Sequence, residues 1–187
     1  MKSISHSGQI RIWLLSTIIM VILMILIGGV TRLTDSGLSM VEWRPLWGFL
    51  PPISQFEWNR VFELYMKSPE YIFKNKGMSL EEFKEIFFWE YFHRLWGRLI
   101  GIVFIIPFIY FVIAKKIEKF ITVRLLFILI LGSLQAFIGW WMVKSGLIDK
   151  PDVSQYRLAI HFGNSLLILL LLFWLILDLK NKKSKIK

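Results

Sequence analysis

The chain has no cysteine, and histidine is nearly as scarce, with 3 among 187 residues. The absence of thiols excludes disulfide bonds, thiolate metal sites and cysteine nucleophiles. Any redox chemistry must therefore use a bound cofactor. Charged residues are also few, at 19% of the chain, and several long stretches contain very few of them.

Four of these stretches are long enough to cross a membrane. Hydrophobic residues make up 56% of the chain, whereas soluble domains contain about 45 to 50% apolar residues. A bilayer core takes about 20 apolar residues as a helix, and the stretches lie at about 12–30, 94–114, 123–143 and 157–178. We predict an all-α integral membrane protein, a four-transmembrane-helix bundle that forms a single membrane domain.

The net charge of +10 does not indicate a nucleic-acid partner, because it is gathered on one side of the predicted membrane. Almost all of the excess lies near the N-terminus, in the connection 115–122 and in the basic tail 179–187. This positive-inside pattern places both termini in the cytoplasm. The tail contacts anionic lipid or serves only to set the topology. The segments 31–92 and 144–156 then lie outside.

The outer segment 31–92 is expected to fold, because it is rich in aromatic residues and too long for a structureless loop. Ser54 and Glu57 form a capping-box pattern, which predicts an amphipathic helix on the outer leaflet. Ser79 and Glu82 form a second such pattern, and no helix breaker separates it from the second span. This second helix should therefore continue into the membrane.

Residues 90–94, EYFHR, place charged groups where the second span enters lipid. Each charge in hydrocarbon costs roughly 2.5 to 3.5 kcal/mol on insertion scales, so the cluster indicates a functional site. Glu90 and His93 share one helix face, and His161 enters the fourth span at a similar depth. Two imidazoles that face each other in a four-helix bundle suit the axial positions of haem iron. A polar packing role is the alternative for either histidine.

Zinc fits these histidines less well than haem does. Structural zinc sites usually need four protein ligands and catalytic sites three. Only His93 and His161 share the outer side, since His6 lies near the cytoplasmic end of the first span.

Two glycines and two arginines follow the histidine of the second span. Gly97 and Gly101 leave a strip without side chains, where a flat macrocycle can approach the backbone. The same GxxxG spacing is equally typical of tight helix packing. Arg94 and Arg98 carry guanidinium groups that suit the carboxylates of haem propionates, although each can also extend to lipid headgroups.

The two predicted helical hairpins resemble each other weakly. GGVTRLTDSGL (28–38) and GWWMVKSGL (139–147) each end one span, and each precedes a span with one histidine near its outer end. A repeated hairpin would place the two histidines at matching depths. Chance similarity between membrane helices is the alternative.

These motifs together resemble the N-terminal half of the haem A synthase family, in the form found in alphaproteobacteria and mitochondria. The resemblance covers the chain from the first span to the fourth. It is carried by five segments in the same order: GGVTRLTDSGLSMVEW (28–43), GFLPP (48–52), EYFHR (90–94), LGSLQAFIGWWMV (131–143) and RLAIHFGNSLL (157–167).

The resemblance implies an oxidoreductase of the bacterial inner membrane that converts the C8 methyl of haem O to the formyl group of haem A, for cytochrome c oxidase. It implies that His93 and His161 hold the substrate haem on the extracytoplasmic side and that Glu90 is catalytic. Haem O synthase is the implied partner that supplies the substrate. A carboxylate near the reacting methyl can stabilise positive charge or act as a base toward water.

The chain departs from the family in length. Family members usually have eight helices, and their second bundle uses another histidine pair to bind a haem b that passes electrons. Here the fourth span is followed by KNKKSKIK (180–187). We therefore expect haem b in a missing second half or in a partner subunit. The chain is then a fragment, the product of a split gene that joins a separately encoded C-terminal half, or a half-size homodimer.

Two other functions are compatible with these residues. A b-type haem-binding subunit, active in electron transfer or as a haem carrier, would use the histidine pair without oxidising a methyl group. A purely structural chain would bind no haem at all.

Overall fold

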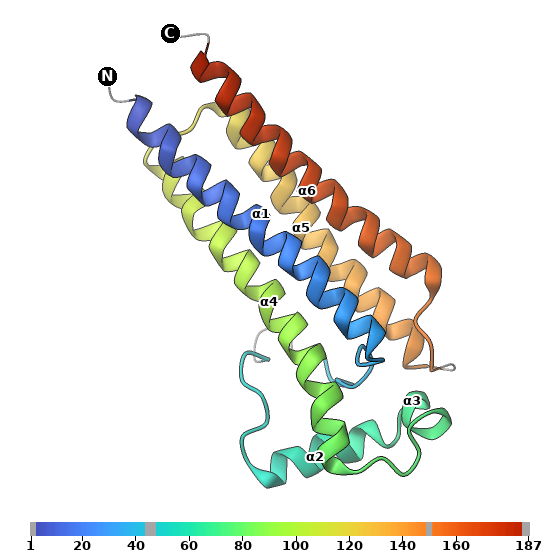
Figure 1. Ribbon diagram of the computed structural model, residues 1–187. Coiled ribbons are helices and arrows are strands. Elements are labelled where there is room, and N and C mark those ends of the chain that lie inside the picture. Colours follow the sequence, from blue (N-terminus) through green and yellow to red (C-terminus); the bar gives the residue numbers. More distant parts are fainter. Residues whose placement is uncertain (1–2, 44–47, 149–150, 185–187) are drawn as a thin grey trace.

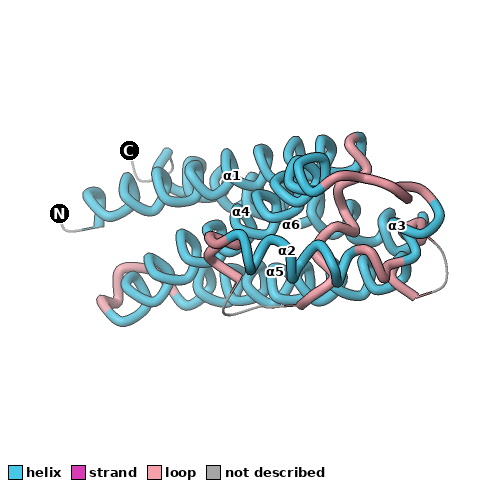
Figure 2. The backbone as a smooth tube through the Cα atoms, turned by 90° about the horizontal axis from the view of Figure 1, so that it is seen from below, coloured by secondary structure: helices cyan, strands magenta, loops and turns pink. Residues whose placement is uncertain are grey.

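The computed structural model describes residues 3–43, 48–148 and 151–184, with side chains from residue 8 to residue 180. Every regular element in these ranges is a helix (Figure 2). The helices are α1 (Ser3–Leu33), α2 (Gln55–Tyr65), α3 (Pro69–Phe73), α4 (Leu80–Ile113), α5 (Lys119–Gly146) and α6 (Gln155–Ser184). The predicted all-α fold is confirmed, since α1, α4, α5 and α6 are long and apolar enough to cross a membrane.

The four long helices run side by side, and both ends of the chain lie at the same end of the bundle (Figure 1). α1 packs against both α4 and α6, and α5 packs against α6, whereas α4 and α5 touch at fewer positions. The order around the bundle is therefore α4, α1, α6, α5. The two helices that carry the predicted ligands, α4 and α6, lie diagonally across it.

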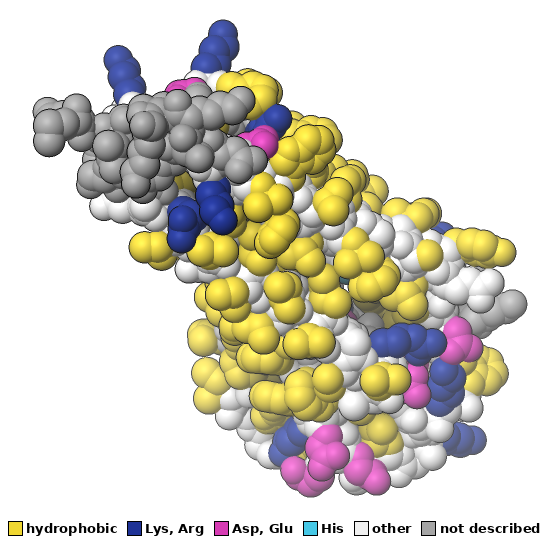
Figure 3. All heavy atoms as spheres, turned by 45° about the horizontal axis from the view of Figure 1, so that its top comes forward, with side chains coloured by type: hydrophobic (Ala, Val, Ile, Leu, Met, Phe, Trp, Pro, Cys, Tyr) yellow, Lys and Arg dark blue, Asp and Glu magenta, His cyan; other side chains and the backbone are white. Residues whose placement is uncertain are grey.

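The surface of the bundle is banded. Figure 3 shows apolar side chains along the body of the long helices, Lys and Arg at the end that carries the termini, and mixed acidic and basic side chains at the opposite end. An apolar band between two charged ends suits a helix bundle that spans a bilayer. The chain is a multi-pass membrane protein.

The apolar core is unevenly packed along the bundle. One cluster of buried side chains joins all four long helices in the half nearer the termini; it includes Leu14, Phe104, Leu125 and Leu172. In the opposite half, the structure describes α4 and α6 in full, yet no apolar side chain of α4 between residues 87 and 104 is buried, and none of α6 before residue 168. Protein interiors are normally close-packed. The half of the bundle that carries the histidines therefore has a less extensive buried apolar core.

Both predicted capping boxes lie at helix starts, but only one is complete. At α4, the Ser79 hydroxyl accepts a bond from the Glu82 amide at 3.3 Å, and the Glu82 carboxylate accepts the Ser79 amide at 2.7 Å. α4 then continues unbroken into the membrane, as predicted. At α2, Ser54 accepts the Glu57 amide at 3.2 Å, but the Glu57 carboxylate binds Arg60 at 3.3 Å. An ion pair one turn away replaces the second half of that box.

The fourth membrane helix is longer than expected. α6 continues to Ser184 and so includes most of the segment 179–187 that was expected as a tail. No glycine or proline interrupts the helix there. Lysine is a good helix former and is favoured near a helix C-terminus. Residues 185–187 of the expected tail lie outside the described residues.

The outer helices α2 and α3 pack on the first turns of α4 through an aromatic cluster. Tyr65 and Phe83 are fully buried, with their ring centroids 4.9 Å apart, and Phe62 lies 5.0 Å from Phe83. Aromatic pairs at such distances add stability beyond the area that they bury. α2 is thereby attached to α4, while Phe56 at its first turn stays exposed and available to the outer leaflet.

A buried carboxyl group lies beside this aromatic cluster. Glu70 is 3% exposed and accepts a hydrogen bond from the Tyr65 hydroxyl at 3.0 Å, and that hydroxyl accepts one from the Asn75 side-chain amide at 2.7 Å. Burial raises the pKa of Glu70 from its usual value of 4.5 to about 7. The folded outer segment therefore favours the protonated form of Glu70.

This shift predicts a pH dependence of the outer segment. Because the folded pKa of Glu70 lies above its unfolded value, its contribution to stability is full below pH 4.5 and is lost as the pH rises through about 7. The loss is on the order of 3 kcal/mol. Hydrogen exchange of the amides of 55–78, corrected for the intrinsic pH dependence of exchange, measures it.

Two variants control this experiment. Glu70→Gln should flatten the dependence between pH 4.5 and 7, because it stays neutral throughout. Glu63→Gln removes an exposed carboxylate of α2 and should leave the dependence intact. An unchanged slope in Glu70→Gln would contradict the assignment.

Candidate functional site

The imidazole of each predicted histidine lies against a glycine of the preceding membrane-spanning helix, which is α1 for His93 and α5 for His161. A methyl group built at Gly28 of α1 would lie 3.3 Å from Nε2 of His93 on α4. A methyl group built at Gly139 of α5 would lie 3.0 Å from Cε1 of His161 on α6. The absence of a side chain at both glycines lets the imidazoles approach the backbone. Both rings lie in the loosely packed half of the bundle.

A second contact is repeated beside each histidine. Trp96, three positions after its histidine, donates its indole N–H to the carbonyl of Met20 at 2.9 Å. Asn164, also three positions after its histidine, donates its amide N–H to the carbonyl of Leu131 at 3.1 Å. Each acceptor lies eight positions before the glycine of its hairpin. These matched contacts support the hypothesis that α1–α4 and α5–α6 are two copies of one hairpin.

Within the described ranges, no three His, Cys, Asp or Glu side chains gather as a metal-ion site. Two imidazoles on diagonal helices fit the axial ligation of a haem better than they fit zinc.

The ring nitrogens of His161 have unequal surroundings. Nδ1 is buried and has no hydrogen-bond partner. Nε2 lies 3.3 Å from the side-chain amide nitrogen of Gln135. A buried polar atom without a partner is uncommon and calls for an explanation such as a bound group or a functional role. His161 is therefore the residue of the predicted pair whose ring has a buried polar atom that the described contacts leave unsatisfied.

Glu90 is the most tightly bound carboxylate of the site. It is 2% exposed, and one of its oxygens accepts bonds from the Ser39 hydroxyl at 2.8 Å and the Met40 amide at 2.6 Å. The other oxygen accepts the Arg94 guanidinium at 2.5 Å. Charge-assisted bonds of this kind are the strongest class of hydrogen bond in proteins. Glu90 thus joins the segment that follows α1 to the buried face of α4.

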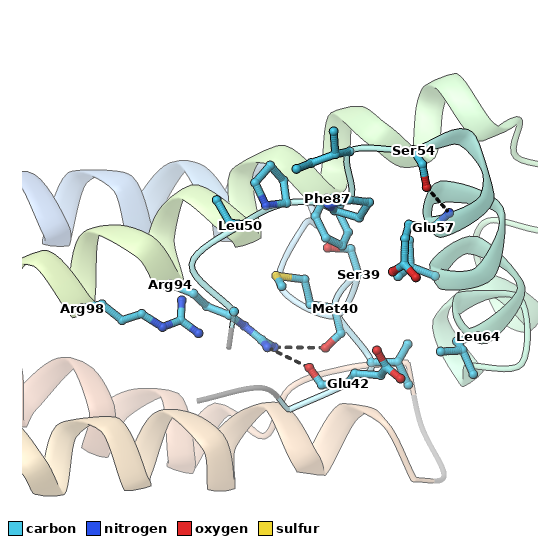
Figure 4. Close-up of a pocket in the computed structure, with 16 residues that line it drawn as sticks. Ser39, Met40, Glu42, Leu50, Ser54, Glu57, Leu64, Phe87, Arg94 and Arg98 are labelled. Atoms are coloured by element: carbon cyan, nitrogen blue, oxygen red, sulfur yellow. Dashed lines mark hydrogen bonds between the residues drawn. The ribbon is translucent and has the colours of Figure 1, made fainter. Parts of the chain in front are cut away.

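Arg94 completes the same junction. Its guanidinium also donates to the carbonyls of Met40 at 3.1 Å and Glu42 at 3.3 Å, as Figure 4 shows. The ring of Trp43 lies 5.5 Å from the guanidinium carbon. The guanidinium group of Arg94 therefore binds groups of this chain and orients the outer segment.

Arg98 lies one turn further along α4, beside a cavity of about 320 Å³ that Arg94 also lines. Apolar side chains of the outer segment and of α4 form much of the wall; they include Leu50, Pro51, Pro52, Ile53 and Phe87. Arg98 extends along one end of this cavity in Figure 4, with the Phe49 ring 5.4 Å from its guanidinium carbon. An apolar cavity with a guanidinium group at its edge suits an amphipathic carboxylate.

Gly97 does not border this cavity. A methyl group at Gly97 would lie 3.3 Å from Cε of Met24 on α1. The contact observed is helix packing, which was the alternative given for the GxxxG spacing. Gly101, in contrast, has no atom within 4 Å of the corresponding position.

Sequence reasoning missed three polar residues of the site: Ser39, Gln135 and Asn164. Ser39 binds a carboxylate 51 positions away, so no local pattern reveals it. Gln135 and Asn164 are amides inside long apolar spans. Amides at such positions usually hydrogen-bond between helices, and this signal could have identified both.

A family model named COX15-CtaA and described as "Cytochrome oxidase assembly protein" matches residues 11–187. A protein of Nitrosospira multiformis named "Heme A synthase" is 55% identical over 92% of this chain and 48% of its own length. Another "Heme A synthase", from Parvibaculum lavamentivorans, is 48% identical over 98% of this chain and 53% of its own length. No solved structure matches the chain.

The chain thus spans about half the length of the curated relatives that it matches. A third relative of the same name, from Agrobacterium fabrum, is 47% identical over 92% of this chain and 47% of its own length.

The histidine–glycine contacts predict which glycines tolerate a side chain. Gly28→Ala and Gly139→Ala should displace the adjoining imidazole, because a methyl at 3.3 or 3.0 Å is tighter than ordinary packing allows. Ligand binding at the histidines should weaken by roughly tenfold, which corresponds to about 1.4 kcal/mol of binding free energy. Titration of the purified protein with haem, followed by its Soret absorbance, measures the change.

The controls are neighbouring glycines with open surroundings. Nothing lies within 4 Å of a methyl group built at Gly29 or Gly132. Alanine at either position should leave the titration unchanged. Equal effects at all four positions would show that helix flexibility, and not the imidazole contact, matters.

Proposed function

Because the chain belongs to the COX15-CtaA family of cytochrome oxidase assembly proteins, we propose that it binds haem O and takes part in its conversion to haem A. In this proposal His93 and His161 are the axial ligands of the substrate iron. The reaction oxidises the C8 methyl of haem O to a formyl group, and the product serves cytochrome c oxidase.

One observation carries the proposal: two imidazoles project from diagonal helices into the only half of the described bundle where α4 and α6 lack a packed apolar core. Bundle cores that accept cofactors do so with side chains on facing helices. The relatives named "Heme A synthase" supply the identity of the haem.

Glu90 supplies negative charge in this proposal. Oxidation withdraws electrons and protons from the methyl group and adds one oxygen atom, so positive charge develops at the porphyrin edge. A preorganised carboxylate stabilises such charge. Both oxygens of Glu90 are already engaged by Ser39, Met40 and Arg94, which favours this electrostatic role over that of a base toward water.

Arg94 and Arg98 have different roles in the proposal. Arg94 orients the outer segment, because its donors bind Glu90 and two backbone carbonyls. Arg98, beside the apolar cavity, is assigned to the haem propionates. Gly97 is proposed as a position where the macrocycle approaches the backbone of α4, and it also packs closely against Met24 of α1.

The remaining components are also proposals. A second four-helix half would hold a haem b that carries electrons for the reaction. That half belongs to the same protein, to a separately encoded subunit or to a second copy of this chain. Haem O synthase delivers the substrate. The site faces the extracytoplasmic side of the inner membrane, with both termini in the cytoplasm, in accord with the basic charge at that end of the bundle.

Expression with haem O synthase and a protein that supplies the second haem-binding half tests this function. Extracted haems should include the formyl product. Glu90→Gln should keep the haem but reduce the formyl product by roughly 10²-fold or more, the usual effect of removing one electrostatic stabiliser. Ser39→Ala is the matched control, since it removes one bond of the same junction and leaves the charge of Glu90 in place.

Four outcomes separate the alternatives. Loss of product in Glu90→Gln but not in Ser39→Ala supports the proposed role. Bound haem without any oxidised product in the wild type indicates a b-type haem carrier or electron-transfer subunit. Haem A at wild-type levels in Glu90→Gln contradicts the role proposed for Glu90. Purified protein without Soret absorbance indicates a structural chain.

A further inference from the structure

A chain of two side-chain amides runs through the apolar interior between α5 and α6 and ends at His161. Asn164 donates one N–H to the carbonyl of Leu131 at 3.1 Å and another to the side-chain oxygen of Gln135 at 2.7 Å. The amide nitrogen of Gln135 donates to the carbonyl of His161 at 2.9 Å and lies 3.3 Å from Nε2 of the same residue. All of these contacts lie at the level of the candidate site.

The direction of this chain is determined by its two ends. The backbone carbonyls of Leu131 and His161 only accept hydrogen bonds. Asn164 must therefore present its NH₂ group to Leu131, and its second N–H then meets the oxygen of Gln135. Gln135 must in turn present its own NH₂ group to His161. Neither amide can be reversed without placing two acceptors against each other.

This direction determines the tautomer of His161. The amide nitrogen of Gln135 can only donate a hydrogen bond, so Nε2 of His161 must accept it through an unprotonated lone pair. In the neutral ring the proton then lies on Nδ1, the nitrogen that is buried without a partner. A metal binds an imidazole through a nitrogen with a free lone pair. Nε2 of His161 is therefore held in the form that iron requires.

We propose that Gln135 is the positioning residue that presents His161 to the iron of the haem. It fixes the tautomer and the ring orientation before the haem arrives. When iron takes the Nε2 lone pair, Gln135 gives up the longer of its two contacts, at 3.3 Å, and keeps the bond at 2.9 Å to the backbone of His161. This inference rests on the proposed ligation of haem by His161.

The first hairpin has no equivalent of this device. The position of α1 that matches Gln135 in the repeat is Met24, which packs against Gly97 of α4. The position that matches Asn164 is Trp96, which binds only the carbonyl of Met20 among the contacts described. A thioether cannot donate a hydrogen bond. Among the described contacts, an amide side chain reaches the ring of His161 and none is given for the ring of His93, so the two candidate ligands are prepared differently.

Nitrogen NMR of the haem-free protein, with ¹⁵N-labelled histidine, tests the inference without any measurement of activity. Only three histidines contribute, so His93→Gln and His161→Gln assign the signals. Wild-type His161 should show the Nδ1–H tautomer. Gln135→Met, which installs the residue of the first hairpin, should abolish this preference, while Met24→Leu should not alter it. An Nε2–H tautomer in the wild type overturns the proposal even if no variant folds.

Haem titration of the same proteins supplies the second measurement. Haem binding costs Gln135 only its longer contact, so the positioning that the variant loses should outweigh the contact that it no longer has to give up. Gln135→Met should therefore bind haem about tenfold more weakly, in line with one lost net hydrogen bond. Asn164→Leu, which frees the amide of Gln135 to reverse, should have a smaller effect in the same direction. Unchanged affinity and an unchanged tautomer in Gln135→Met contradict the inference. Absence of haem binding in the wild type contradicts the proposed function instead.

Discussion

The contact between an imidazole and a glycine of the preceding helix is the constraint on which the candidate site depends. A neutral ring nitrogen inside an apolar bundle is costly unless it has a partner, and in this fold the rings are held by backbone surfaces without side chains. Gly28 holds His93, and Gly139 holds His161. The same contact therefore occurs in both hairpins and places both candidate ligands.

The junction at Glu90 connects this bundle to the outer segment. Its carboxylate binds a hydroxyl, a backbone amide and a guanidinium, so the segment after α1 is tied to α4 one turn from His93. Lys74 of the outer segment also pairs with Asp152 of the α5–α6 connection at 2.7 Å. The outer segment is thus attached to both hairpins, which suits a cover over a site that opens near the end of the bundle.

Features that depend on a few neighbouring residues could be predicted from the sequence. The four spans, the complete capping box at Ser79 and the pairing of His93 with Glu90 on one helix face all follow from spacing within a turn or a span. Contacts between helices could not be predicted. Gln135 meets His161 across 26 positions, and nothing in its own helix indicates which partner it takes. The contact of Gly97 with Met24 likewise depends on the neighbouring helix.

The spin state of bound haem tests the central claim most directly. Electron paramagnetic resonance of the ferric, haem-loaded protein should show the low-spin signal of an iron with two imidazole ligands. Substitution of either His93 or His161 by alanine should convert it to a high-spin signal or release the haem. A low-spin signal that survives either substitution would contradict the proposal that these two side chains share one iron.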